Sequence, residues 1–151
     1  EKMQKGHTAA EIVAAGQKAR RCGLALSVTA ISGLGSVAHW REHAAATARA
    51  VSEMKPDYLG LLTLMVEPGT PLEAWVREGS FTLLSPLEVL KETELFLQHV
   101  DSEGTGFRAN HASNYLTLKG ALNGDRKALL AQIAAALDGR RDLKPEFLRA
   151  L

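Results

Sequence analysis

The sequence predicts an α/β fold in which parallel strands alternate with helices. Residues 24–31 and 58–66 are nearly continuous in apolar and β-branched side chains, which is typical of strands covered on both faces. Each follows a stretch with helical periodicity, and short links join the four segments. Helix, strand, helix and strand connected in this way form parallel strands with right-handed crossovers.

Capping signals mark where several helices begin. The segments TAAE at 8–11, TPLE at 70–73 and SPLE at 85–88 each match a capping box, in which a hydroxyl and a carboxylate satisfy free backbone N–H groups. The predicted helices cover about residues 8–22, 36–54, 71–77 and 86–99, and a fifth starts at Asp125. A weaker strand is predicted at residues 105–109, and after Val66 the chain becomes mainly helical.

Composition limits the classes of function. The 151 residues carry a net charge of +1, which gives no electrostatic reason to bind nucleic acid or a membrane surface. No apolar run approaches the roughly 20 residues of a membrane span, so we expect a cytoplasmic protein. Cys22 is the only cysteine. A single cysteine excludes an internal disulfide and a cysteine-built metal site. We expect the Cys22 side chain to be buried.

Two glycine-containing turns follow the predicted strands and define a candidate site. ISGLG at 31–35 and EPGT at 67–70 lie at the carboxyl edge of the sheet, where α/β proteins bind ligands. Tight turns and helix caps would explain the same residues. Neither GxGxxG spacing nor a Walker motif is present, although binding of a phosphorylated metabolite at residues 33–35 stays an alternative.

Polar side chains are dense in residues 107–116. We identify Arg108, His111 and Asn114 as groups that bind substrate or order the loop, with side-chain to backbone hydrogen bonding as the structural alternative. The segment HWREH at 39–43 matches an inverted zinc-binding pattern, but it lacks a third ligand. A solvated helix face explains it better, and we predict no metal ligands.

The order of several short motifs resembles the second half of the radical S-adenosylmethionine barrel. The motifs are KGHT at 5–8, CG at 22–23, ISGLG at 31–35, KPDY at 55–58 and PGTPL at 68–72. Thr29 stands where the family's G-x-I-x-G pattern has its first glycine, while Ile31 and Gly33 match. The later HASNYL and LKG segments look like one subgroup of these enzymes labelled Fe–S oxidoreductases. The resemblance covers about residues 3–137.

This resemblance implies an enzyme in which a four-iron, four-sulfur cluster reductively cleaves S-adenosylmethionine to act on an unknown substrate. It implies that Ile31 and Gly33 flank the adenine and ribose and that backbone near Leu64 and Met65 contacts the adenine. The family's C-x-x-x-C-x-x-C motif is missing, since Cys22 stands alone. We therefore expect a catalytically inactive fragment that binds neither cofactor by itself.

The resemblance also implies a division of the chain. Residues 1–78 would be the C-terminal part of a partial (β/α) TIM-like barrel, and residues 79–151 a mainly helical extension. A barrel fragment would expose the edge of the 24–31 strand, so we expect self-association through that edge. The alternatives are a non-catalytic interaction module that grips a partner with residues 111–116, or the small phosphometabolite-binding protein.

Overall fold

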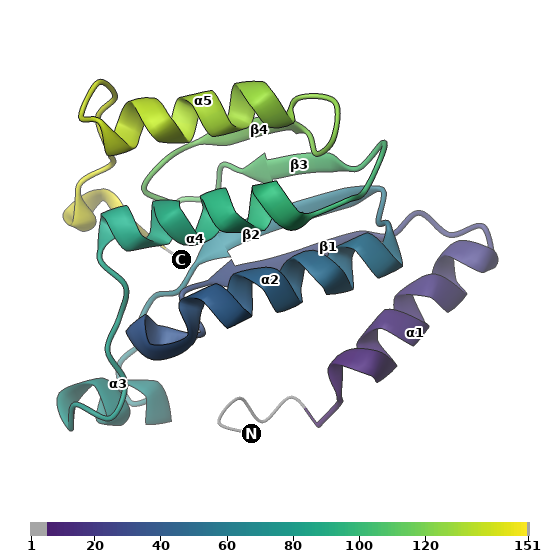
Figure 1. The fold of residues 1–151 in the computed structure, drawn as a ribbon. Helices are drawn as coiled ribbons and strands as arrows, with labels where there is room; N and C mark the ends of the chain where they lie inside the picture. The colour runs from purple at the N-terminus through teal and green to yellow at the C-terminus, as the bar shows by residue number, and fades with distance from the viewer. Residues whose placement is uncertain (1–5, 151) are drawn as a thin grey trace.

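Residues 6–150, the part that the computed structural model describes, form a four-stranded open sheet with five α-helices (Figure 1). In chain order the elements are α1 (Ala9–Arg21), β1 (Ser27–Ser32), α2 (Ser36–Met54), β2 (Tyr58–Thr63), α3 (Pro71–Arg77), α4 (Pro86–His99), β3 (Gly106–Ala109), β4 (Leu118–Ala121), α5 (Arg126–Leu137) and the short 3-10 helix η1 (Glu146–Leu148). The predicted α/β class is confirmed.

The strands lie in the order β1-β2-β3-β4. β1, β2 and β3 run parallel, with Ser27 opposite Tyr58 and Tyr58 opposite Gly106. β4 is antiparallel to β3, so the sheet is mixed. The weak strand expected near residues 105–109 is present as β3, whereas β4 was not predicted. Two strands from the expected mainly helical part therefore extend the sheet that β1 and β2 begin.

Local capping explains where most helices begin. Thr8 and Ser85 form two of the three predicted capping boxes, with Glu11 and Glu88 as partners. Thr70 caps α3 by accepting a hydrogen bond from the Glu73 amide. Asp125 makes no capping bond to α5, because its carboxylate accepts from the Ala121 amide in the preceding turn.

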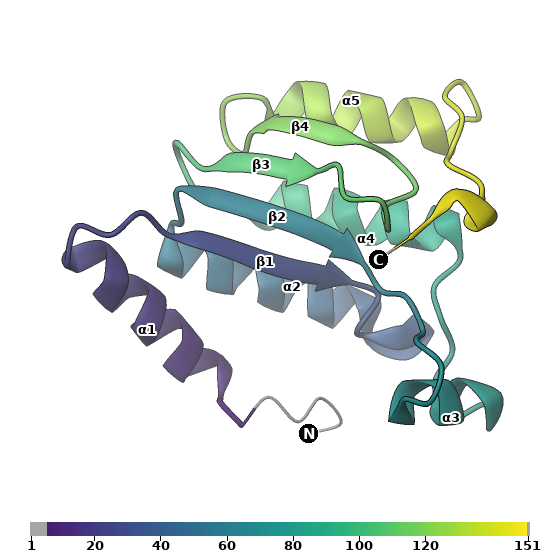
Figure 2. The same cartoon turned by 180° about the vertical axis from the view of Figure 1, so that it is seen from behind.

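Helices α2, α4 and α5 cover one face of the sheet, and the core lies between them and the strands (Figure 1). The largest buried core side chains include Phe107, Leu59, Leu97, Leu129 and Ile133. The opposite face carries no helix among residues 6–150 (Figure 2). The expectation that the strands are covered on both faces was wrong. Burial alternates along β2, and Tyr58 is 58% exposed.

Helix α1 packs against α2 and leaves the outer edge of β1 unpaired. A Cβ atom added at Gly16 would come within 2.9 Å of Met54 Sδ, so glycine permits this close contact. Among the described residues β1 pairs only with β2, and self-association through its free edge stays a prediction. Cys22 is exposed at the end of α1, contrary to expectation. Between residues 6 and 150 no helix has the length and apolar character to cross a membrane.

Candidate functional site

The carboxyl ends of β1 and β2 lie side by side, because the two strands are parallel and Ser32 is opposite Thr63. The Leu64 amide donates to the Ser32 carbonyl over 2.9 Å, which extends the pairing beyond the strands. Gly33 then turns the chain with a φ of +94°, a region that side chains rarely adopt. A Cβ atom at Gly33 would lie 3.2 Å from Leu64 Cβ, so a larger residue there would press on Leu64, which directly follows β2.

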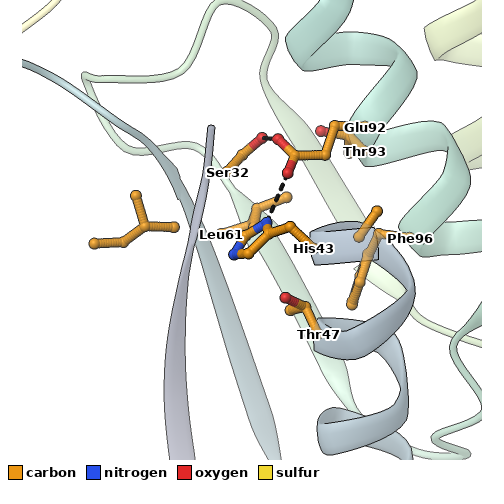
Figure 3. A pocket seen from close by; sticks show the side chains of 9 residues that line it. Ser32, His43, Thr47, Leu61, Glu92, Thr93 and Phe96 are labelled. Carbon is orange, nitrogen blue, oxygen red and sulfur yellow. Dashed lines mark hydrogen bonds and ion pairs between the residues drawn. The ribbon is translucent and has the colours of Figure 1, made fainter. Parts of the chain in front are cut away.

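A buried carboxylate holds this turn in place (Figure 3). Glu92 is 2% exposed, and its Oε2 accepts hydrogen bonds from the Ser32 hydroxyl and, over 2.7 Å, from the Gly33 amide. Its Oε1 lies 2.7 Å from Nδ1 of His43. These four residues, which we call the Glu92 cluster, connect the end of β1 to α2 and α4. A buried carboxylate needs such partners to offset the loss of water.

Helical periodicity turns Glu92 toward the sheet. Val89 and Phe96, three residues before it and four after it on α4, are both buried, so Glu92 shares the apolar face of that helix. The prediction that residues 39–43 form a solvated helix face was wrong for His43, whose side chain is 26% exposed. His39 is exposed and has a non-helical φ of −136°. The two histidines therefore do not share one regular helix face.

A hollow of about 270 Å³ opens beside the cluster at the ends of β1 and β2. It is lined by Gly33, Thr63, Leu64, Met65, Val66, Leu83, Leu84, Val89, Tyr115, Glu146 and Arg149. The structure thus brings Gly33, Leu64 and Met65 together. Ile31 does not line this hollow. It borders a cavity of about 10 Å³ next to His43 and Glu92, which has room for little more than a water molecule.

The C-terminal segment, residues 145–150, closes one side of the hollow. The Arg149 side chain is 4% exposed, and its Nη2 donates to the Leu64 carbonyl over 3.0 Å. Its Nε donates to the Ser113 carbonyl over 2.6 Å, and its guanidinium lies 4.1 Å from the centre of the Tyr115 ring. Nη1 bonds both the Tyr115 hydroxyl and Glu146. No sequence pattern around Arg149 indicates this role.

Tyr115 and Glu146 titrate abnormally because of these contacts. Burial raises the pKa of Tyr115 to about 12, and the hydrogen bond that its hydroxyl donates to Glu146 over 2.6 Å adds to the rise. For Glu146, burial favours the protonated acid, but hydrogen bonds from Arg149 and Tyr115 outweigh it and lower the pKa of the carboxyl. Tyr115 is therefore a neutral phenol that bonds the carboxylate of Glu146 and the guanidinium of Arg149.

We expect stability to fall at high pH because of Tyr115. A tyrosine in the unfolded chain ionises near pH 10, whereas the pKa of folded Tyr115 is about 12. Below pH 10 both states hold the proton, so this tyrosine adds no pH dependence. Between about pH 10 and 12 the unfolded state releases its proton first, and the free energy of unfolding decreases. Absorbance at 295 nm should show a step near pH 12 that Tyr115→Phe removes. A wild-type titration complete by about pH 10.5 would contradict this.

The loop that contains residues 111–116 docks onto the end of β2. β3 pairs with β2 only as far as Gly60, and loop side chains then bind the β2 backbone. Ser113 Oγ accepts from the Thr63 amide over 3.2 Å, and Asn114 Nδ2 donates to the Leu61 carbonyl over 2.8 Å. His111 Nδ1 bonds Ser113 Oγ at 3.0 Å. His111 therefore bonds within the loop, and Asn114 ties the loop to the β2 backbone.

The turn at residues 33–35 differs from a phosphate-binding loop. The Gly33 amide already donates to Glu92, and the Ser36 and Val37 amides donate to the carbonyls of Gly33 and Thr82. A phosphate at this turn would find these donors in use and a buried carboxylate behind them. These features disfavour the binding of a phosphorylated metabolite at residues 33–35.

No protein-family model matches the chain, and neither a curated protein nor a solved structure matches it.

Proposed function

We propose that the chain is the C-terminal part of a radical S-adenosylmethionine enzyme and that the hollow receives the adenosine portion of the cofactor. One observation carries the proposal. Gly33, Leu64 and Met65, which the resemblance assigns to the adenine and ribose, line the same hollow at the ends of two parallel strands. Ligands of α/β proteins bind at this edge.

The form of the sheet supports the barrel part of the proposal. Among residues 6–150 one sheet face has no helical cover, and β1 has no partner on its outer edge. A segment of barrel wall has both properties, because its inner face encloses the lumen and its edge strand continues to the next strand. In this proposal β1 and β2 are two such wall strands and α2 is the crossover helix between them.

The hollow fits the adenosine portion better than the whole cofactor. Its volume of about 270 Å³ lies just below the roughly 300 Å³ at which small-molecule pockets begin. Leu64, Met65, Val66 and Leu84 provide apolar walls for a flat base. The residues do not fit the iron–sulfur cluster, because cluster iron is held by several cysteine thiolates and the chain has only Cys22. We propose that residues outside this chain supply those cysteines and that the chain alone is catalytically inactive.

Nuclear magnetic resonance of the full 151-residue chain tests the proposal, with S-adenosylhomocysteine at high concentration as the probe, because without the cluster the chain alone should hold the adenosine portion only weakly. We expect amide shifts to change at Gly33, Leu64 and Met65. Gly33→Ala should weaken binding by about tenfold or more, equivalent to about 1.4 kcal/mol, because the new Cβ would press on Leu64.

Gly139→Ala is the matched control for this substitution. Gly139 also has a positive φ, +71°, so it bears the same kind of backbone strain, but nothing lies within 4 Å of its added Cβ. The affinity of the Gly139→Ala variant for S-adenosylhomocysteine should equal that of the wild type. Shifts confined to residues 111–116 would favour the interaction module instead. Equal losses of affinity in Gly33→Ala and Gly139→Ala would show that Gly33 does not lie at the binding site.

A further inference from the structure

A row of four residues crosses the uncovered face of the sheet, one from each strand. Thr29 on β1 is opposite Gly60 on β2, Gly60 is opposite Arg108 on β3, and Arg108 is opposite Lys119 on β4. The residues that alternate with this row pack into the core beneath the helices, and they are Val28, Ala30, Leu59, Leu61, Phe107, Ala109 and Leu118. Because side chains alternate across a strand, the row faces the uncovered side.

The two cations in this row lie opposite each other on neighbouring strands. Like charges directly opposite each other on neighbouring strands destabilise a sheet. Within residues 6–150 neither Arg108 nor Lys119 forms an ion pair with a carboxylate. Arg108 Nη1 donates over 2.8 Å to the carbonyl of its own neighbour Phe107, which leaves the rest of the guanidinium fork without a partner. An anion between the two side chains would relieve the repulsion.

Space for such an anion lies next to Arg108. Gly60 has no side chain, and the nearest atom to a Cβ built there is Thr29 Oγ1, at 3.8 Å. The Thr29 hydroxyl thus borders the gap on one strand, and Arg108 is the residue opposite Gly60 on the other. Ile31 and Leu62, a partly exposed apolar pair two residues nearer the carboxyl edge, extend the same face toward the ends of β1 and β2.

We propose that this row binds the anionic group, a carboxylate or phosphate, of a small molecule whose apolar part lies over Ile31 and Leu62. Arg108 supplies a planar fork that suits either anion, and Lys119 supplies a second positive charge. The inference rests on the proposed function, since in a barrel wall this face is the lumen and the molecule is the substrate. Two cations are too few to hold a nucleic-acid strand along its backbone.

Titration of the full chain with inorganic phosphate and with benzoate, followed by nuclear magnetic resonance, tests the site. Thr29, Gly60, Arg108 and Lys119 should shift with both anions, and Ile31 and Leu62 with benzoate alone. Arg108→Gln should weaken both by about tenfold or more. Lys119→Gln should weaken both by a smaller factor.

Lys127→Gln is the matched control, because Lys127 is exposed on α5, on the helical side of the sheet, and its loss lowers the net charge equally. If Lys119→Gln and Lys127→Gln weakened anion binding equally, the binding would reflect only the net charge of the protein, and the proposal would be overturned. Tighter binding of a single-stranded oligonucleotide than of either small anion at the same row would overturn it as well. S-adenosylhomocysteine reports on Gly33, Leu64 and Met65 instead, so failure at one site is distinguishable from failure at the other.

Discussion

Replacing Glu92 with alanine is expected to lower the free energy of unfolding by about 3 to 5 kcal/mol. The substitution leaves the Gly33 amide and the Ser32 hydroxyl buried without an acceptor and removes the partner of His43. A buried donor without a partner costs about 1 to 3 kcal/mol. The loss would be a large share of the roughly 5 to 15 kcal/mol that stabilises a typical domain.

Two further variants separate the carboxylate from the helix that bears it. Glu92→Gln keeps an oxygen for Ser32 and Gly33 but presents an amide to His43, so it should cost less than alanine. Gln98→Ala is the control, because Gln98 is exposed on the same helix. Urea unfolding followed by circular dichroism measures all three. A loss below about 1 kcal/mol for Glu92→Ala would mean that water replaces the carboxylate and that the Glu92 cluster does not hold the turn.

Most of the fold was predictable because its signals are local. A capping box occupies four consecutive residues, so the starts of α1 and α4 could be read directly. β1 and β2 are recognisable from their apolar, β-branched runs. β4 was missed because it has only four residues, two of which are Lys119 and Gly120. Its strand conformation depends on antiparallel pairing with β3, which no local pattern reveals.

The place of the candidate site was predictable, because the ISGLG and EPGT turns follow two strands that were predicted to be parallel. Gly33, Leu64 and Met65 were assigned to the cofactor only through the family resemblance, and that assignment stays a prediction. Glu92 and Arg149 could not be predicted, since their hydrogen-bond partners lie far away in the sequence. Ser32 is 60 residues from Glu92, and Leu64 is 85 residues from Arg149. Each looks locally like an ordinary charged residue, and only tertiary packing gives it a buried role.

The same dependence on tertiary packing makes Arg149 a sensitive position. Arg149→Ala is expected to lower the free energy of unfolding by about 2 to 4 kcal/mol, since hydrogen bonds from charged groups contribute about 1.5 to 3 kcal/mol each and water will replace part of them. The Leu64 and Ser113 carbonyls lose their donor, and Glu146 loses its cation. Residues 145–150 should then leave the hollow.

Arg140→Ala is the matched control. The Arg140 side chain is 67% exposed and pairs at the surface with Asp138, so its loss should change stability by no more than about 0.5 kcal/mol. Arg149→Lys should fall between the two alanine variants, because lysine keeps the charge but cannot bond several acceptors in one plane. Urea unfolding measures the three stabilities, and hydrogen exchange of the Arg149 backbone amide reports the opening of the segment. If Arg149→Ala were as mild as Arg140→Ala, the C-terminal segment would not be a wall of the hollow, and Leu64 would be held in place by its bond to β1 alone.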